Sequence, residues 1–543
     1  MARCRLLLTG ALTAGAMFVP TTSSLASASS ANLAAPGCTD SWRAPVSGAW
    51  SDAADWTNGI PGEAGPVAAC ITVAGTYTVT LAPWAIGGGI HNGASIESLV
   101  LGAAVGEGKE TLVVDGQSST SDSNEQLNIT FLATTATSVI RARGVLVLAT
   151  TDGGTRPKDV PYGGVAAVTG GAFLNYGAVR TKVQDAMNKS ADQAQFLAQV
   201  TNEPDGSVTD QSGQLEVNSV TNDGSWTVAS GASLDLAFQS PGSGYNSGVF
   251  TNSGMVINKG SISAQQGTWA QVGGPVKGNA VVLQDAATLM DRSGAANFLV
   301  NQDSAQLFGT VPAGQTITVV GEPFSYQGDE YYSTALGLGG KTLINNGTIV
   351  LEAQGTKTTG GAAELSDGAV RNNGAIVAEA HKTAWTVVWT VGLTNNRSGT
   401  VTVASGTTNQ AGDGSDANAG TVILAPGAVW LLQEGSAFTN QRGGRVVPEI
   451  AGPSRFGQFQ MASPCCNGAG ALNAGGALRP TLVGGYQPAA GKEFPVFSLV
   501  GGKFVGTFNS VQSPFTADYA HGTTTPAFVG VIYKSSKLKT AKI

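Results

Sequence analysis

The sequence predicts an all-β protein built as a β-solenoid, and three observations carry that prediction. Of its 543 residues 75 are glycine, about twice the usual share of roughly 7%. Only 12% are charged, about half the usual 25%, while the hydrophobic share is an ordinary 42%. The third observation is a recurring Asn–Gly motif. The composition excludes a coiled coil, a charged disordered chain and collagen, which needs glycine at every third position.

The repeated motif has the form apolar-x-Asn-x-Gly-x-apolar. Its key asparagines, including two in looser copies, are Asn175, Asn222, Asn252, Asn345, Asn372, Asn395 and Asn440. Most intervals between them lie near one, two or four multiples of about 23 residues, which is typical of one β-solenoid coil. Each copy predicts a short strand, a corner and a second short strand. At the corner, Asn and Gly are expected to take the left-handed backbone conformation.

The solenoid is expected to span residues 71–450, with alternate side chains pointing inward. Strings such as 227–236 and 422–430 predict a strand, a glycine turn and a second strand. Residues 181–200 break the pattern, because they contain neither glycine nor proline and their apolar residues recur at helical spacing. Those residues are Val183, Met187, Ala191, Ala194 and Leu197. They predict one inserted helix, which either packs on a face of the solenoid or forms a partner-binding lid.

The N-terminus has the features of a secretory signal peptide over residues 1–28. Arg3 and Arg5 precede an apolar stretch, and Ala26-Ser27-Ala28 matches a cleavage pattern. The mature protein is therefore expected to begin near Ser29, to be secreted to the medium or cell surface, and to have no membrane span. The net charge of −7 argues against a nucleic-acid partner.

Four of the five cysteines follow that cleavage point, and disulfides are the default in the compartment that secretion implies. The pairing Cys38–Cys70 is favoured, because the alternatives join segments about 400 residues apart. It would close an N-terminal cap over residues 29–70. The adjacent Cys465 and Cys466 would then form a vicinal disulfide or stay free thiols. A metal site there is disfavoured, because nearby partners are lacking.

Both ends of the solenoid are expected to carry caps, because a terminal coil otherwise exposes its core and strand edges. Trp42, Trp50 and Trp56 suit the core of the N-terminal cap, and a carbohydrate-binding aromatic platform is the competing interpretation. Residues 451–533 predict a C-terminal β cap. Residues 534–543 form a basic tail that is expected to be solvated.

The two ends resemble known proteins. The Trp50–Trp56 spacing, the run Asn-Gly-Ile-Pro-Gly at 58–62 and the run Gly-Thr-Tyr-Thr-Val-Thr-Leu at 75–81 resemble the start of secreted bacterial β-helix proteins. Residues 472–482, 488–497 and 505–508, followed by Tyr519, resemble the end of autotransporter passenger domains of the pertactin and haemagglutinin-like type. This resemblance implies a right-handed parallel β-helix and surface or adhesive roles. Unlike that family, the chain is not expected to continue into a membrane β-barrel after Tyr519.

Candidate catalytic residues are few. His91, His381 and His521 each stand alone in the sequence, and incidental histidines are the expected interpretation. The motifs of zinc proteases, serine hydrolases and phosphate-binding loops do not occur. Glu352 and Glu379 hold similar places in successive Asn–Gly coils, so the fold would stack them on one face as a glycosidase carboxylate pair requires. Ordinary solvated carboxylates are the alternative.

Further candidates have equally ordinary alternatives. Asp329 and Glu330 beside two tyrosines form a second possible carboxylate pair. Trp385 and Trp389 would face one side of a strand and, with Trp430 and Trp226, form a sugar-stacking stripe, unless they pack in the core. Residues 413–416, Asp-Gly-Ser-Asp, offer oxygens to calcium but lack the spacing of a full calcium loop, so an acidic turn is favoured.

The sequence thus favours a secreted, non-catalytic β-helix protein with a surface-interaction or adhesin-like role and a glycan or cell-surface partner. The first alternative is an extracellular polysaccharide-acting enzyme, a lyase or glycoside hydrolase, on the same fold. The second is a structural surface component. No cofactor and no metal ion are predicted. A cleft with converging carboxylates and aromatic side chains would distinguish the enzyme from the other two.

Overall fold

The computed structural model describes residues 37–86, 89–91, 93–116, 126–131, 136–150, 165–183, 193–240, 244–321, 324–326, 329–331, 333–354, 361–381, 386–411, 415–433, 435–462, 470–519 and 527–534. The predicted signal peptide, most of the basic tail, Cys465 and Cys466 lie outside these ranges. Within them, no helix has both the length and the apolar character needed to cross a membrane.

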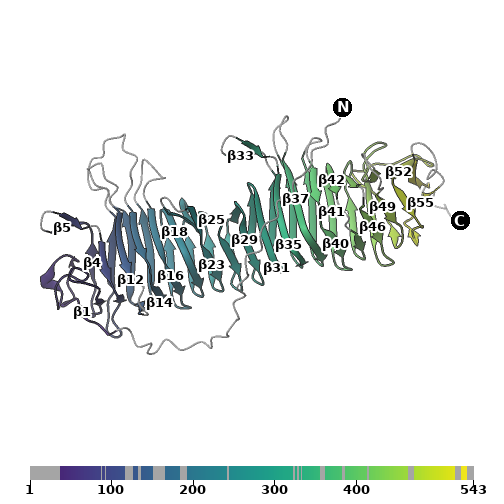
Figure 1. Ribbon diagram of the computed structural model, residues 1–543. Helices are drawn as coiled ribbons and strands as arrows, with labels where there is room; N and C mark the ends of the chain where they lie inside the picture. Colours follow the sequence, from purple (N-terminus) through teal and green to yellow (C-terminus); the bar gives the residue numbers. More distant parts are fainter. Residues whose placement is uncertain are drawn as a thin grey trace, which may run out of the picture. The chain divides into compact units, whose positions relative to one another are not determined.

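These residues form a parallel β-helix, as predicted, in which the chain returns coil after coil to pair with itself (Figure 1). Nine described strands form one sheet: β2 (Gly48–Ala49), β4 (Tyr77–Leu81), β9 (Glu110–Asp115), β12 (Gly144–Thr150), β15 (Ala178–Val183), β17 (Ser207–Asp210), β19 (Ser225–Val228), β24 (Met255–Asn258) and β27 (Val276–Gly278). Two neighbouring parallel strands cannot be joined by a tight hairpin, so the rest of each coil forms the connection between them.

A second, 41-stranded sheet of described residues runs through both halves of the β-helix. Its first half contains β1 (Asp40–Ser41), β3 (Ala68–Ile71), β7 (Gly93–Ile96), β8 (Ser98–Leu101), β10 (Gln126–Phe131), β11 (Thr137–Ile140), β13 (Val165–Thr169), β14 (Ala172–Asn175), β16 (Gln193–Asn202), β18 (Gly213–Asn222), β20 (Ala232–Asp235), β23 (Val249–Asn252), β25 (Ser261–Gln265), β26 (Thr268–Gln271), β28 (Val281–Gln284) and β29 (Ala287–Asp291).

The second half of that sheet holds the strands that carry the candidate site. They are β30 (Asn297–Asn301), β31 (Ser304–Val311), β32 (Thr316–Gly321), β35 (Ser333–Asn345), β36 (Thr348–Ala353), β37 (Ala362–Asn372), β38 (Ala375–Ala380), β39 (Thr386–Trp389), β40 (Gly392–Asn395), β41 (Thr400–Ser405), β42 (Thr407–Gln410), β43 (Ser415–Asn418), β44 (Thr421–Leu424), β45 (Val429–Leu432), β46 (Ala437–Asn440) and β47 (Arg445–Ile450).

Three antiparallel hairpins interrupt the coils: β5 (Trp84–Ile86) with β6 (Gly89–His91), β21 (Ala237–Ser240) with β22 (Gly244–Ser247), and β33 (Phe324–Tyr326) with β34 (Asp329–Tyr331). Figure 1 shows β5 and β33 outside the stack of parallel strands. Each hairpin lies between two strands of the parallel stack and lengthens the coil that contains it.

Alternating burial along each strand gives the β-helix its core. Strand β44, for example, buries Val422 and Leu424 and turns Thr421 and Ile423 outward. Aromatic rings from different coils meet inside: the rings of Phe250 and Trp269 stack with centroids 4.5 Å apart. This period-two pattern is what the strings of apolar and small polar residues predict.

The asparagines of the repeated motif form a buried ladder in the first half of the protein. Asn175, Asn202, Asn222 and Asn252 are fully buried, and each donates from Nδ2 to the side-chain oxygen of the next residue in the ladder. The donor–acceptor distances are 2.8, 2.7, 2.9 and 3.3 Å, the last to Gln271. A buried amide must be paired, and here its partner is the amide of an asparagine, or in the last step of Gln271, one coil on.

A second ladder follows the same rule in the other half. It contains Asn345, Asn372, Asn395, Asn418 and Asn440, joined by Nδ2–Oδ1 hydrogen bonds of 2.7, 2.8, 2.7 and 2.8 Å. Successive members are 27, 23, 23 and 22 residues apart, whereas the first ladder has steps of 27, 20, 30 and 19. The predicted coil of about 23 residues therefore describes the second ladder better than the first.

The second hydrogen of the ladder amides also has a partner. Asn372 donates to the carbonyl of Thr400 at 3.1 Å, and Asn395 donates to that of Thr421 at 3.2 Å. Each of these asparagines therefore ties the corner of one coil to the start of the strand in the next. In a low-dielectric interior such a fully paired network fixes both register and corner geometry.

The corner glycines are present for a different reason from the one predicted. Gly254 and Gly374 do not have positive φ angles. A Cβ on Gly374 would lie 2.1 Å from the carbonyl oxygen of Gly347, and one on Gly254 would lie 2.1 Å from that of Gly224. The left-handed expectation was therefore wrong for these corners, where glycine allows the corners of adjacent coils to touch.

Left-handed glycine occurs instead in the glycine turns of the strings 227–236 and 422–430. Gly231 and Gly427 have φ angles of 83° and 88°, and a Cβ on either would meet no atom within 4 Å. Space is not the constraint there, and the backbone conformation alone favours glycine. The glycine excess therefore has two structural causes, at corners and at turns.

Two other residues take the ladder positions between the two asparagine ladders. Asp291 lies in register with Gln271, and Gln315 donates to the Asp291 carboxylate. Both side chains are buried, and burial raises the pKa of Asp291 to about 7. The repeated motif is not recognisable in this stretch of sequence, which explains the long interval between Asn252 and Asn345.

The prediction of an inserted helix over residues 181–200 was wrong for the described residues of that segment, which form strands. Residues 178–183 belong to β15 and residues 193–202 to β16, while 184–192 lie outside the described residues. Ala194, Phe196, Ala198 and Val200 are all buried and alternate along β16. Pairing with β13, β14 and β18 stabilises that strand, so tertiary contacts override the helical spacing of its apolar residues.

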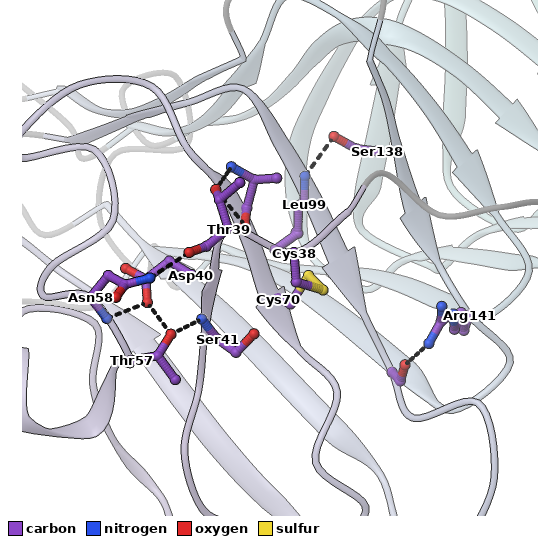
Figure 2. Close-up of a disulfide and its surroundings, with 12 residues drawn as sticks. Cys38, Thr39, Asp40, Ser41, Thr57, Asn58, Cys70, Leu99, Ser138 and Arg141 are labelled. Carbon is purple, nitrogen blue, oxygen red and sulfur yellow. Dashed lines mark hydrogen bonds between the residues drawn. A yellow bond between two sulfur atoms is a disulfide. The ribbon is translucent and has the colours of Figure 1, made fainter.

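The N-terminal residues contain the predicted disulfide between Cys38 and Cys70 (Figure 2). Beside it, the buried Asp40 carboxylate accepts from the Thr57 hydroxyl at 2.9 Å and from the Asn58 backbone N–H at 3.0 Å. The Asn58 side chain donates to the carbonyl of Thr39 at 2.6 Å. The disulfide and these bonds hold β1 against β3, the start of the large sheet.

The three tryptophans of this segment are core residues. Trp42 and Trp50 each lie edge-on to Trp56, with centroids 5.1 and 4.8 Å from it, and all three are buried. Their indole N–H groups donate to backbone carbonyls, including that of Pro61. The interpretation as a carbohydrate-binding platform was therefore wrong, because no ring face is free for a sugar. The single 3-10 helix among the described residues, η1 (Ala53–Asp55), precedes Trp56.

At the C-terminal end the parallel pattern gives way to antiparallel pairing. The last described strands are β48 (Gln458–Ala462), β49 (Ala471–Asn473), β50 (Ala477–Leu478), β51 (Thr481–Leu482), β52 (Glu493–Val500), β53 (Lys503–Val505), β54 (Ser510–Val511), β55 (Phe515–Asp518) and β56 (Ala527–Tyr533). Strand β56 pairs antiparallel with both β52 and β55. Such pairing ends the succession of coils and covers strand edges.

Candidate functional site

The two glutamates that the repeat places at equivalent positions lie next to each other on the outer surface. Glu352 of β36 and Glu379 of β38 are register partners in neighbouring coils. Glu352 and Glu379 each lie between two buried residues of their strand, so both side chains face outward. The predicted stacking on one face is what the register shows.

Two further side chains join them from the positions two residues on. The Nε2 atom of His381 lies 2.7 Å from Oε1 of Glu352, and Gln354 donates to the same oxygen at 2.6 Å. The backbone N–H of His381 donates to the carbonyl of Ala353 at 3.2 Å, which fixes this residue against the preceding coil. We call Glu352, Gln354, Glu379 and His381 the Glu–His cluster.

The Glu–His cluster brings one imidazole and two carboxylates together. One ligand atom from each of Glu352, Glu379 and His381 lies within 4.8 Å of the other two. His381 is 44% exposed and Glu352 23% exposed, so solvent reaches the cluster. Carboxylate and imidazole groups at this separation can hold a divalent cation, or the two carboxylates can act as an acid–base pair.

Sequence analysis missed the part of the Glu–His cluster that His381 supplies. The histidine was expected to be incidental, because no other histidine or cysteine is close to it in sequence. Its contact with Glu352 spans 29 residues, one coil of the β-helix. The signal was present in the paired strings Glu352-Ala353-Gln354 and Glu379-Ala380-His381, which the register superimposes.

The Glu–His cluster lies at one edge of a regular outer surface made by β32, β36, β38, β41 and β44. Its side chains form two columns, one of Thr316, Thr348, Ala375, Thr400 and Thr421 and one of Thr318, Val350, Val377, Thr402 and Ile423. All are partly exposed and in register. We call these ten residues the Thr/Val face.

The predicted tryptophan stripe does not lie on the surface. Trp389 and Trp430 are fully buried, with ring centroids 6.0 Å apart, and Trp226 is buried in the other half. Trp385 lies outside the described residues. The described tryptophans of this set therefore pack in the core and cannot stack on a sugar, which is the alternative that the sequence left open.

The other acidic candidates are also placed differently. Asp329 and Glu330 lie in β34, the second strand of a hairpin. Asp413 lies outside the described residues. Asp416, expected at an acidic turn, is 1% exposed in the core, where its Oδ1 accepts the Leu393 N–H at 2.9 Å. The register explains the burial, because Asp416 occupies the position that Phe438 takes in the next coil.

Buried acids recur inside the β-helix, which sequence analysis did not predict. Burial raises the pKa of Asp416 to about 8 and that of Asp210 to about 7, the latter against a lowering hydrogen bond from Thr181. On the outer side of β18, burial also raises the pKa of Glu216 to about 7, although Gln195 donates to it at 3.0 Å. Each shift follows from the cost of charging a desolvated carboxyl.

One hollow lies near the C-terminal end and has different chemistry. Its volume is about 470 Å³, and its lining includes Leu499, Phe504, Tyr519 and Val529. The Tyr519 hydroxyl accepts the N–H of Phe508 at 3.0 Å. The lining mixes these apolar side chains with Lys503 and Thr507 and contains no carboxylate, so the Glu–His cluster remains the candidate site with paired acidic groups.

Comparison with known proteins adds little to this geometry. No protein-family model matches the chain, and no curated protein matches it. Among solved structures it is similar to the crystal structure of the TibC-catalysed, hyper-glycosylated TibA fragment, at 13% identity, with a TM-score of 0.21, over 74% of this chain and 99% of that one. Because the TM-score is so low, this likeness carries no inference about the present chain.

Proposed function

We propose that this is a secreted, adhesin-like protein that binds an extended glycan or cell-surface partner through the Thr/Val face without catalysing a reaction. The observation that carries the proposal is the register of that face. Threonine, valine and isoleucine side chains, with Ala375 as the one exception, are aligned at equivalent positions in five coils. Adjacent strands repeat at about 4.8 Å, so the surface presents hydroxyl and methyl groups at a fixed spacing.

Such a surface suits a long, repetitive partner better than a small molecule. Its side chains are held by strands on both sides, so little conformational freedom is lost on binding. The β-branched residues have few rotamers, which keeps their hydroxyl and methyl groups in place. The Cys38–Cys70 disulfide supports the extracellular part of the proposal, because disulfides persist in oxidising compartments.

Binding of the mature protein to glycan arrays and intact cells tests the proposal. Thr402→Arg should weaken binding at least tenfold, because it places a long charged side chain in the middle of the Thr/Val face. Thr394→Arg is the matched control, since Thr394 is exposed on β40, outside that face. Equal binding by both variants would contradict the proposal, and no binding by any form would favour a structural surface component.

A polysaccharide-acting enzyme is the second candidate, and the separation of Glu352 and Glu379 favours it. Their oxygens come within 4.8 Å, near the carboxyl separation of about 5 Å in retaining glycosidases. A depolymerisation screen with Glu352→Gln and Glu379→Gln tests it. Turnover by the unmodified protein that both substitutions abolish would replace the non-catalytic proposal. Glycan binding without turnover would support the adhesin-like one.

A further inference from the structure

We infer that the Glu–His cluster is a binding site for a divalent transition-metal ion of the Zn²⁺ type. Glu352, Glu379 and His381 would supply the three protein ligands. The inference concerns metal binding alone and holds whether the protein is an adhesin or an enzyme. It starts from the register of the two glutamates, which the fold enforces.

Stacking like charges in neighbouring strands is unfavourable. Glu352 and Glu379 are register partners, and directly opposed like charges destabilise a sheet. The β-helix cannot relieve this by sliding one strand, because the same register aligns the buried Ile349 with Ile376. A counter-charge held between the two carboxylates removes the repulsion without any change in register.

The side chains that contact the Glu352 carboxylate do not contact that of Glu379. Both His381 and Gln354 contact one atom, Oε1 of Glu352. Among the described residues, no hydrogen-bond donor contacts the Glu379 carboxylate. A second stacked acid pair, Glu216 and Asp235, differs because each member has a glutamine donor, at 3.0 Å from Gln195 and 2.6 Å from Gln214. In the part of the chain that the structure describes, Glu379 therefore lacks the glutamine donor that Glu352, Glu216 and Asp235 each have.

The kinds of ligand atom select the kind of ion. Calcium takes six to eight oxygen ligands, which two carboxylates and one amide do not supply. Zinc takes four ligands, commonly histidine nitrogen and carboxylate oxygen, and its sites can leave one position to water. An imidazole with two carboxylates also suits other borderline divalent ions such as Co²⁺. The Gln354 amide would turn its donor toward a bound carboxylate, as it does now toward Glu352.

Calorimetry with ZnCl₂ on the full mature protein, with its free thiols alkylated, tests this assignment. One equivalent of Zn²⁺ should bind, and His381→Asn or Glu379→Gln should lower the affinity at least about tenfold, as even outer-shell substitutions do at metal sites. Asparagine at 381 retains a polar side chain beside Glu352 but removes the imidazole ligand. Excess Ca²⁺ should not displace the zinc.

The matched control is Glu203→Gln, which changes a stacked acid pair without a histidine. Glu203 interacts electrostatically with Asp223, one coil on, and its substitution should leave zinc binding unchanged. Co²⁺ added to the same protein should give visible absorption bands that disappear in the His381→Asn variant. Three results would overturn the assignment: no saturable zinc binding, binding unaffected by His381→Asn and Glu379→Gln, or displacement of zinc by equimolar Ca²⁺.

Discussion

The inner asparagine ladders and the outer Glu–His cluster use the same structural device with opposite energetic results. In both, the register of the coils superimposes like residues. An amide carries both donor and acceptor, so a stack of asparagines satisfies itself. A carboxylate only accepts and carries a charge, so a stack of glutamates needs donors or a cation from elsewhere. Identical stacking therefore stabilises the interior and leaves unsatisfied charge on the surface.

The largest expected effect on the free energy of unfolding comes from a substitution in the buried asparagine ladder, compared with one in a part-exposed ladder beside it. Asn395→Ala removes hydrogen bonds to Asn372, Asn418 and the Thr421 carbonyl, all buried or partly buried. It should lower the free energy of unfolding by about 3 kcal/mol or more, since each unsatisfied buried group costs about 1–3 kcal/mol. Denaturant-induced unfolding measures the change.

The adjacent Asn396→Ala is the matched control for that substitution. Asn396 belongs to a part-exposed ladder, where it donates to Asn373 at 2.7 Å and Asn373 donates to Asn346 at 2.9 Å. Water can replace these bonds, so the expected loss is below about 1 kcal/mol. If the two substitutions cost the same, burial does not distinguish the inner ladder from the outer one.

The second prediction concerns the buried acid that interrupts the core column beside the ladder. The folded state holds the proton of Asp416 up to about pH 8, whereas an unfolded aspartate loses it near pH 4. Between these values the folded protein binds more protons than the unfolded chain, so stability should fall as the pH rises. Thermal unfolding at pH 5 and pH 8 should show this loss, on the order of a few kcal/mol.

Asp416→Asn should reduce that pH dependence, because asparagine has no proton to lose and its oxygen can still accept the Leu393 N–H. Part of the dependence should remain, because burial also raises the pKa of Asp210 and Asp291. Asp367→Asn, at an exposed position, should leave the profile unchanged. A profile that is the same in the Asp416→Asn variant would show that Asp416 does not titrate in this range.

The smallest expected effect is on the outer surface. In metal-free protein at low salt, Glu379→Gln should raise the free energy of unfolding by about 0.2–1 kcal/mol, because it removes a like charge directly opposite Glu352. Glu449→Gln is the control, since its register partner is the neutral Thr481. A loss of stability on Glu379→Gln would mean that the carboxylate pair is already compensated in the free protein.

The fold was predictable because its determinants recur in the sequence. Asn–Gly corners and alternating strands predicted the β-helix, and the intervals predicted its coils. Three ladder members escaped detection for local reasons. Asn202 has its glycine four residues on, Asn418 follows Asp416 where the motif has an apolar residue, and Gln271 is a glutamine. In all three cases the side-chain amide still makes its ladder hydrogen bond, although the sequence motif around it differs.

The candidate site was only half predictable. The equal positions of Glu352 and Glu379 in their coils placed them together, but the contribution of His381 depends on its own backbone contact with the preceding coil. The tryptophans were ambiguous because a strand period does not say which face points inward. Burial of Trp389 and Trp430 was decided by the rings of neighbouring coils. The helix was mispredicted because pairing partners, not spacing, determine the conformation of β16.

The two asparagine ladders begin and end on the backbone. The first residues, Asn175 and Asn345, accept the N–H of the glycine two positions on, and the final Asn440 donates to the carbonyl of Gly475. In the second ladder, every asparagine between these ends meets an identical residue on either side. Loss or duplication of one coil of this ladder would therefore leave the amides on both sides of the change with an asparagine partner.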